Sequence, residues 1–457
     1  MTKEAPVVLW FRRDLRLGDH AALLAASKRS KHVLALYVLD DALLAPAGNP
    51  RIAFLHGCLR ALDEQLGGRL KLVKGEPAEE VVKAARAVGA AAVYVTADTG
   101  PYGRRRDGEV AKVLAEHDIA WEEAGSPYAI TPGRITKPDG DPYRVFTPFF
   151  RAWTRHGWPR PADTGASIVD WVEPGKSLKI PKSPSLGEME LPEPGEQAAL
   201  DVWREFHESA VAGYSAGRDR PDKPATTKIS PYLRWGCIHP RTLLADLAGD
   251  ESEGAAALRG EFAWREFHAD VLWNRPETAR QNYDERFDAM QHETGAAARA
   301  AFGQWCEGRT GYPIVDAGMR QLLAEGWMHN RVRMVVASFL VKDLHIPWWW
   351  GARHFMQYLV DGDLASNQLN WQWVAGSGTD AAPYFRVFNP TTQGEKFDPN
   401  GDYVRKYVPE LREVPGKAVH QPWKLNAGQP EGYPEPMVDH AHERQVALRR
   451  YEDIKGQ

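Results

Sequence analysis

Residues 260–273, GEFAWREFHADVLW, combine a carboxylate, an indole, a guanidinium and an imidazole at helical spacing. Glu261, Trp264, Arg265 and His268 stand at i, i+3, i+4 and i+7, so a helix would present them on one face. A carboxylate beside an aromatic plane can read a base by hydrogen bonding and stacking. The alternative is an amphipathic surface helix on which Glu261 and Arg265 form an i,i+4 ion pair. The spacing alone favours neither interpretation.

A second polar group opens the segment 326–342, GWMHNRVRMVVASFLVK. Asn330 and Met334 would share one helical face, and Arg331 and Arg333 flank an apolar continuation that is typical of a buried helix. Asn can read a base edge, and Arg can pair with a phosphate or a carboxylate. Because polar groups that enter a buried helix need partners, internal capping of a helical bundle is the alternative.

Residues 361–401 have the most unusual composition in the chain. They contain Asp361 and Asp363, several asparagines, and the indoles of Trp371 and Trp373 before a run of small and turn-forming residues. Such a composition is poor material for a core. A DxD pair could bind a divalent cation, but no further carboxylates stand at ligand spacing and the surroundings are aromatic. The sequence therefore does not favour a metal site.

The segment 226–236, TTKISPYLRWG, places three hydroxyls and a lysine directly before a predicted helix. Ser230 is expected as its N-cap and Pro231 as its first helical residue. Free backbone amides at such a terminus can bind phosphate. The local pattern by itself is satisfied more simply by an ordinary capped helix.

Composition limits the class of protein. A chain of 457 residues with 43% hydrophobic residues predicts a globular protein of two or three domains. No apolar run is long enough to span a bilayer, and the N-terminus lacks the pattern of a signal peptide, so we expect a cytoplasmic protein. The three cysteines form no zinc or CxxC pattern. A net charge of −4 does not exclude DNA, because a local basic patch is enough to bind phosphates.

The first third of the chain must position the segments just described. Short β-branched runs at 7–10, 33–39, 70–73 and 91–96 alternate with helical patterns, which predicts a doubly wound parallel sheet. Ligands of such sheets bind beyond the carboxyl ends of the strands, where residues 11–20 and 98–107 fall. Neither segment is a GxGxxG motif or a P-loop, so a dehydrogenase or a P-loop ATPase has no support.

The remainder changes character twice. Prolines multiply from about 131 to 200 and periodicity is lost over much of that stretch, which predicts a long surface connector. Beyond it the pattern is mostly helical. Helices are predicted around 200–216, 255–272, 314–326, 331–343 and 351–360, and a short charged helix near the end.

Together these motifs resemble the flavin-binding domain of class I photolyases, and residues 11–23, FRRDLRLGDHAAL, resemble the N-terminal signature of the same photolyase/cryptochrome family. The motifs follow the family's order over most of the chain. The resemblance implies an α/β antenna-chromophore domain at 1–130, an interdomain linker at 131–199, and an all-α FAD-binding catalytic domain at 200–457. It also implies a monomeric carbon–carbon lyase in which light drives an electron from reduced FAD to a flipped-out cyclobutane pyrimidine dimer in DNA and splits it.

The resemblance assigns roles by position. The residues expected to hold FAD are Tyr214, Thr226, Thr227, Lys228, Ile229, Ser230, Arg265, Arg333, Asp361, Asp363 and Asn367. Those expected to contact the lesion or the flanking DNA backbone are Arg218, Glu261, Trp264, Asn330, Arg331, Met334, Trp373 and Gln393. Glu261, Asn330 and Asn367 would be catalytic, and Trp305, Trp348 and Trp371 would relay electrons to the flavin from the surface.

Two departures from the family pattern concern the cofactors. The common NNGGWQW reads NQLNWQW at 367–373, so Leu369 and Asn370 replace glycines expected beside the flavin. The antenna site, judged from Arg51 and PYGRRRD at 101–107, resembles binders of 8-hydroxydeazaflavin more than binders of methenyltetrahydrofolate. Gly100 stands where deazaflavin binders often carry an acid, so folate or no second chromophore are the alternatives.

Three other functions compete with dimer repair. A cryptochrome-type photoreceptor is disfavoured by Asn367, where plant cryptochromes carry Asp, and by the presence of the Glu261, Trp264, Asn330 and Met334 set. A (6-4) photolyase is disfavoured by Asn330, where those enzymes usually carry His. A nucleotide-binding α/β protein with a helical partner domain leaves the polar, tryptophan-rich second half unexplained.

Overall fold

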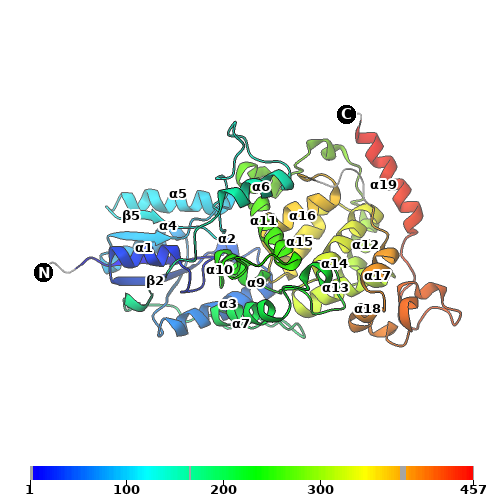
Figure 1. Cartoon of the computed structure of the whole chain (residues 1–457), viewed down its shortest axis with the longest axis horizontal. Coiled ribbons are helices and arrows are strands. Elements are labelled where there is room, and N and C mark those ends of the chain that lie inside the picture. Colours follow the sequence, from blue (N-terminus) through cyan, green and yellow to red (C-terminus); the bar gives the residue numbers. More distant parts are fainter. Residues whose placement is uncertain (1–3, 164–165, 381–386, 456–457) are drawn as a thin grey trace. The chain divides into compact units, whose positions relative to one another are not determined.

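The computed structural model describes residues 4–163, 166–380 and 387–455. The chain forms two compact units (Figure 1). The first comprises Met1–Ser185, Pro192–Ala212 and Thr227–Pro276, and the second Leu186–Leu191, Gly213–Thr226 and Glu277–Gln457. The expected domain limits at 130 and 199 remain a prediction.

A parallel β-sheet forms the centre of the first unit. Its strands are β1 (Val7–Phe11), β2 (His32–Leu39), β3 (Lys71–Lys74), β4 (Ala92–Val95), β5 (Ala120–Glu123) and β6 (Asp170–Trp171). The order is β3-β2-β1-β4-β5, with β6 paired to β2, and these pairings are parallel. The order grows in both directions from β1, which confirms the doubly wound fold. The short strands β5 and β6 were not predicted.

Helices cover both faces of this sheet. They are α1 (Ala21–Arg29), α2 (Asp41–Leu44), α3 (Asn49–Gln65), α4 (Pro77–Val88) and α5 (Pro101–Ala115). One buried cluster joins Val8 and Trp10 of β1 to Val81 of α4 and Val110 of α5. The alternate β1 residues Val7, Leu9 and Phe11 are also buried, as expected for a parallel sheet covered on both sides.

The predicted connector contains regular structure. Helix α6 (Phe146–His156) lies within it and packs against α11 (Glu253–Asn274) in the same unit. Phe149 and Trp153 of α6 are almost fully buried, so contacts with a distant helix stabilise a segment that is too proline-rich to predict a helix. The prediction of a long connector over 131–199 did not include this buried helix.

The helix after the TTKIS segment begins slightly differently from the prediction. Helix α9 (Ser230–Trp235) has Ile229, not Ser230, at its N-cap position, and Ser230 is its first residue. Ile229 already has nearly helical dihedral angles, φ −80° and ψ −11°, which shifts the start. The other helices of this unit are α7 (Glu196–Ser209) and α10 (Pro240–Asp246).

Gly236 ends α9 in a conformation and a position that do not accommodate a side chain. Its φ is +68°, and a Cβ would stand 1.9 Å from the carbonyl oxygen of Arg13. We expect Gly236→Ala to lower the free energy of unfolding by about 2–3 kcal/mol, because left-handed strain of about 1–2 kcal/mol adds to the clash. Gly89→Ala is the control, since Gly89 has a φ of +65° and its Cβ would meet nothing within 4 Å. Equal shifts in urea midpoint for the two variants would contradict the prediction.

The second unit is helical. Its α-helices are α8 (Tyr214–Gly217), α12 (Ala296–Cys306), α13 (Pro313–Glu325), α14 (Asn330–Ser338), α15 (Trp348–Tyr358), α16 (Leu364–Ala375), α17 (Pro390–Phe397), α18 (Asp402–Tyr407) and α19 (His440–Lys455). A π-helix, η4 (Phe339–Asp343), follows α14. The 3-10 helices in the described parts of the chain are η1 (Ala166–Ile168), η2 (Pro276–Ala279), η3 (Glu285–Ala289), η5 (Pro409–Leu411), η6 (Gly416–His420) and η7 (Pro422–Lys424).

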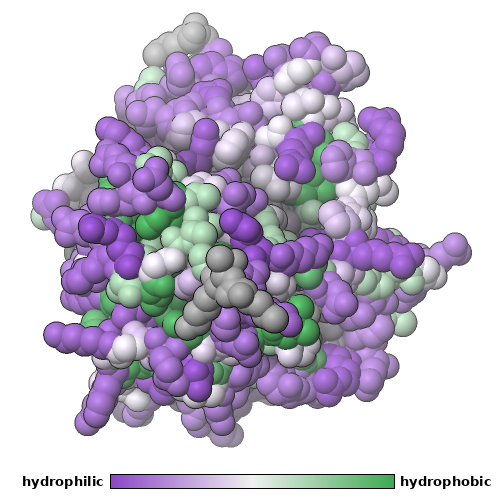
Figure 2. Space-filling model, turned by 90° about the vertical axis from the view of Figure 1, so that its left-hand side faces the viewer, coloured by the Kyte–Doolittle hydropathy of each residue, from purple (hydrophilic) through white to green (hydrophobic). Residues whose placement is uncertain are grey.

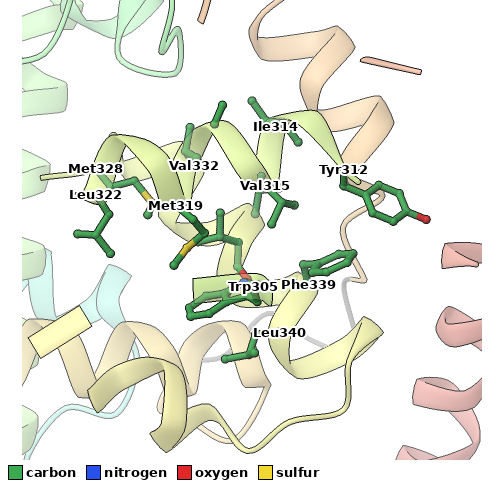
Figure 3. Close-up of a cluster of buried hydrophobic side chains, with 14 of the residues drawn as sticks. Trp305, Tyr312, Ile314, Val315, Met319, Leu322, Met328, Val332, Phe339 and Leu340 are labelled. Carbon is green, nitrogen blue, oxygen red and sulfur yellow. The ribbon is translucent and has the colours of Figure 1, made fainter. Parts of the chain in front are cut away.

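The core of the second unit is assembled from several helices. Figure 3 shows Trp305 of α12 beneath Met319 and Val315 of α13, with Leu340 below the indole. Phe339 and Leu340 are also fully buried, so the π-helix contributes directly to this core. The core packs α14 against both α13 and α16, and α14 and α16 together carry seven of the candidate residues of this unit.

Surface chemistry agrees with the composition. The face seen in Figure 2, on the side where α1, α4 and β5 lie in Figure 1, is mostly hydrophilic with small scattered hydrophobic areas. Within the described ranges, no helix has both the length and the apolar character needed to cross a bilayer.

Candidate functional site

The candidate residues fall into two groups, one in each unit. In the first unit, Glu261 and Trp264 lie half-buried on α11, as the helical spacing predicted. Arg265 on the same face donates to the carbonyl oxygens of Pro127, at 3.0 Å, and Leu233, at 3.3 Å. Arg265 therefore attaches α11 to two other backbone segments of the first unit, at Pro127 and at Leu233.

The indole of Trp264 is held between aromatic neighbours. The ring of Phe146, the first residue of α6, lies parallel to it with 3.7 Å between centroids and 8° between planes. Phe267 and His268 approach the indole at 5.7 Å and 5.6 Å. His268 is itself buried. The Trp264 plane is thus defined by α6 as well as by its own helix.

Two buried carboxylates on α11 attach the preceding linker. Glu266 accepts hydrogen bonds from the backbone N–H of Ile130, at 3.1 Å, and from Trp153 Nε1, at 2.7 Å. Asp270 accepts from the N–H of Gly133 at 2.7 Å. Sequence reasoning missed both residues, although their carboxylates at i and i+4 on the apolar side of α11 were a visible signal.

Burial raises the pKa of Glu266 to about 7, although the N–H donors around it act in the opposite direction. The native state therefore keeps this proton up to about pH 7, whereas the unfolded chain loses it near its ordinary pKa of 4.5. The bound proton of Glu266 therefore stabilises the native state fully below pH 4.5, and this contribution to the free energy of unfolding is lost as the pH rises through 7.

We expect Glu266→Gln to remove this dependence. The free energy of unfolding of the wild type should fall relative to that of the variant by on the order of 2 kcal/mol between about pH 5 and pH 8. Urea unfolding at several pH values measures it, with the exposed Glu64→Gln as control. A gap that stays constant or widens with pH would refute the assignment.

The Thr227–Ser230 segment also belongs to the first unit. Lys228 has a φ of +48°, and the N–H of Ile229 donates to Thr227 Oγ1 at 3.3 Å. The backbone turns sharply here directly before α9. Such a turn directs consecutive amides to one side, which suits phosphate oxygens.

In the second unit, Arg333 and Asp361 form a largely buried ion pair. Arg333 Nη2 is 2.8 Å from Asp361 Oδ2 and Nη1 is 3.3 Å from Oδ1, a bidentate geometry. The Asp361 side chain is only 4% exposed. Asp363 is buried and caps α16 by accepting from the N–H of Ser366 at 3.1 Å. The DGD motif is therefore engaged by protein partners.

Asn367 is buried on α16 with its amide hydrogens engaged. Nδ2 donates to the carbonyl oxygen of Ala352 at 3.0 Å and to Gln368 Oε1 at 2.8 Å. The side-chain oxygen is the atom left to accept from a ligand N–H. Leu369 is buried, whereas Asn370 is exposed and donates to the Ser366 carbonyl oxygen. The expectation of poor core material was therefore wrong over α16, while residues 381–386 of that stretch lie outside the described residues.

The candidate DNA-contacting residues of this unit lie on α14 and near it. Asn330 is exposed and Met334 half-buried on α14, and Trp373 is half-buried on α16. Arg331 pairs with Asp219 at 2.9 Å and lies 4.5 Å from the ring of Phe397. Phe397 stands four residues after Gln393 on α17, so Arg331 and Gln393 face the same region.

Two further candidates precede the TTKIS segment. Tyr214 is buried at the start of α8, and the Arg218 guanidinium lies 5.8 Å from its ring. Thr226 ends the same stretch of the second unit and is half-buried.

The three relay candidates are almost fully buried. Trp305 and Trp371 meet edge to face with centroids 6.2 Å apart. Trp348 donates from Nε1 to Asn282 Oδ1 at 2.9 Å and lies 5.9 Å from Trp349, which is 36% exposed. Because Trp305, Trp348 and Trp371 are themselves shielded, Trp349 is the aromatic neighbour that leads from Trp348 to solvent. The sequence-based assignment of the relay did not include Trp349.

Comparison with known proteins finds matches for segments of both units. Residues 7–165 match the family model described as "DNA photolyase", and residues 258–453 the one described as "FAD binding domain of DNA photolyase". A deoxyribodipyrimidine photo-lyase of Agrobacterium fabrum is 40% identical, over 99% of both chains. The chain belongs to the DNA photolyase family. A Streptomyces griseus photolyase-family relative of the same name is 41% identical over 98% of this chain and 99% of its own.

Solved structures agree with this photolyase-family membership. A bacterial class III photolyase from Agrobacterium tumefaciens is 39% identical, with a TM-score of 0.92 over 100% of this chain and 99% of that chain. A Synechocystis cryptochrome is 28% identical, with a TM-score of 0.87 over 98% of this chain and 100% of that chain. Membership and fold are thus confirmed, while the class I label is not.

The FAD-binding region of this photolyase-family chain, 258–453, contains Arg333, Asp361, Asp363 and Asn367. A buried, neutralised ion pair and a buried amide with a remaining acceptor fit a polar, uncharged ring system such as flavin. No cluster of metal-ligating side chains occurs in the described parts of the chain.

Proposed function

We propose that this chain is a deoxyribodipyrimidine photo-lyase that uses light to split cyclobutane pyrimidine dimers in DNA. The observation that carries the proposal is the face of α11 on which a half-buried carboxylate, Glu261, stands one turn from a half-buried indole, Trp264. Photo-lyases of this name are 38% to 41% identical to it over 97% or more of this chain.

The protein residues would bind and orient the lesion. Trp264 and Trp373 would form apolar walls, while Glu261 and Asn330 would hydrogen-bond to the pyrimidine carbonyl and imide groups. Met334 would fill space beside them, and Arg218, Arg331 and Gln393 would contact the flanking backbone. A damaged step is poorly stacked, so flipping it costs less than flipping normal bases, which favours the lesion.

FAD, once bound, would supply the light-driven electron. Its phosphates and ribityl chain would be held by Tyr214 and the residues Thr226 to Ser230, with support from Arg265, Arg333 and Asp361. Asp363 would lie near the flavin and adenine, and Asn367 would offer its oxygen to flavin N5. Trp371, Trp305 and Trp348 would carry electrons inward, a role supported by the Trp305–Trp371 contact at 6.2 Å.

The finer class and substrate are also proposals. Class I was expected from the motifs, but similarity to the class III enzyme from Agrobacterium tumefaciens over the whole chain favours class III. Asn330 favours the cyclobutane dimer over the (6-4) lesion. A cryptochrome-type photoreceptor is the second candidate, because a cryptochrome of Synechocystis shares the fold at 28% identity.

Repair of a defined thymine-dimer oligonucleotide tests the proposal. Purified, photoreduced protein should restore thymines under blue light and not in darkness, and a (6-4) oligonucleotide should remain unrepaired. FAD-loaded protein without repair of either lesion would replace the proposal with the photoreceptor. Repair of the (6-4) lesion alone would replace the substrate.

A second chromophore is proposed for the α/β region. Arg51 is buried on α3, and Gly100 occupies the N-cap position of α5. We expect 8-hydroxydeazaflavin there, with methenyltetrahydrofolate or no antenna as alternatives. An archaeal photolyase from Sulfolobus tokodaii, which is 30% identical to this chain, is described with two FAD molecules and the implication of a novel light-harvesting cofactor. Mass spectrometry of the released chromophores distinguishes these outcomes.

A further inference from the structure

One contact in the first unit has no part in the function described so far. Phe146, outside the expected site residues, lies face to face with Trp264 at 3.7 Å between centroids and 8° between planes. The two residues are far apart in sequence and come from α6 and α11, which run together in Figure 1. Both rings are only half-buried, so the pair borders solvent.

Two buried side chains of α6 attach this helix to α11 and thereby fix the position of Phe146. Trp153, fully buried, donates to Glu266 on α11 at 2.7 Å, and Phe149, also buried, lies 5.1 Å from Phe267. These attachments lie one and two turns along α6 from Phe146. They leave the helix little freedom to slide along α11, and the Phe146 ring is placed by them.

We propose that Phe146 is a positioning residue for lesion recognition: it covers one face of the Trp264 indole and holds that ring in the plane against which a pyrimidine dimer packs. This inference rests on the proposed photo-lyase function. An indole on a helix can change rotamer, and a parallel ring at van der Waals distance opposes that change. With one face covered, the dimer has only the other face and the edges of Trp264 available.

The expected effect follows from the strength of an aromatic pair. Loss of such a contact corresponds to roughly a 3- to 10-fold change in an equilibrium constant. Phe146→Leu, which keeps an apolar side chain without the ring, should weaken binding of dimer-containing DNA by about this factor and leave undamaged DNA unaffected. Phe146→Tyr should restore wild-type affinity, because it restores the ring.

The experiment is a double-mutant cycle on the FAD-loaded full chain. Binding of dimer-containing and undamaged oligonucleotides is measured for wild type, Phe146→Leu, Trp264→Ala and the double variant. If Phe146 acts through Trp264, its replacement has no further effect once Trp264 is alanine. The matched control is Trp273→Leu, since Trp273 is a half-buried aromatic residue of α11 whose ring meets the Arg104 guanidinium at 3.8 Å.

Three outcomes would overturn the proposal. Additive losses in the cycle would mean that Phe146 acts independently of Trp264. An equal loss for Trp273→Leu, or a thermal midpoint lowered in parallel with affinity, would assign Phe146 a general structural role. Tighter dimer binding by Phe146→Leu would mean that Phe146 occupies the lesion's own position. Failure of wild type to prefer dimer-containing DNA would instead refute the proposed function itself.

Discussion

Replacement of Arg333 by alanine is expected to lower the free energy of unfolding by about 3 kcal/mol and to leave the purified protein largely without FAD. The variant removes the bidentate partner of Asp361, whose side chain is 4% exposed. A buried carboxylate without its cation must either stay charged in a poor solvent or take up a proton. Urea unfolding reports the first effect, and flavin absorbance relative to protein reports the second.

Arg320→Ala is the matched control. Arg320 also makes a 2.7 Å ion pair in the second unit, with Glu410, but the Glu410 side chain is 26% exposed, whereas that of Asp361 is 4% exposed. Water can compensate the remaining charge, so the loss should be about 1 kcal/mol or less and FAD should be retained. Equal destabilisation by the two variants, or full flavin content in Arg333→Ala, would contradict the role given to the buried pair.

Trp264→Ala carries the second large effect. Stacking of one base on an aromatic side chain is worth about 1–3 kcal/mol, so affinity for dimer-containing DNA should fall roughly 10- to 100-fold. Affinity for undamaged DNA and FAD content should change little, because they depend on other groups. Fluorescence anisotropy with matched oligonucleotides measures the binding, and single-turnover repair at saturating DNA separates binding from the later steps.

Trp273→Ala controls for loss of an indole from the same helix. Trp273 also lies half-buried on α11, where its ring meets the Arg104 guanidinium at 3.8 Å. This variant should bind the dimer like wild type. A similar loss of affinity in both variants would show that removal of any α11 indole disturbs the region, and the assignment of Trp264 would fail.

Local pattern predicted the elements whose own residues carry a clear hydrophobic pattern. The β-branched runs at 7–10 and 33–39 are strands β1 and β2. The periodic segment at 255–272 lies within α11, and the segment at 314–326 coincides with α13 to within one residue at each end. In these segments each side of the element has one kind of environment, so hydrophobic periodicity reports it directly. The placement of Glu261 and Trp264 on one helical face followed for the same reason.

Two errors share a physical cause. Helix α6 was missed because its stability comes from Phe149 and Trp153 packing on α11, which no local pattern reveals. The polar segment of α16 was judged unfit for a core, yet Gln372 is fully buried. Its amide donates to the Thr278 carbonyl oxygen and accepts from the Tyr283 N–H, both at 2.8 Å. Polar side chains enter a core when distant backbone groups satisfy them.

The sequence by itself determined the fold class, the family and the helical face that carries Glu261 and Trp264. Strand alternation, helical spacing and motif order are all visible in the linear order of the residues. Only the tertiary structure decided that Phe146 covers Trp264, that Glu266 is buried among N–H donors, and that Trp305 meets Trp371. Each of these depends on residues far apart in sequence, whose distance and burial are set by the packing of whole helices.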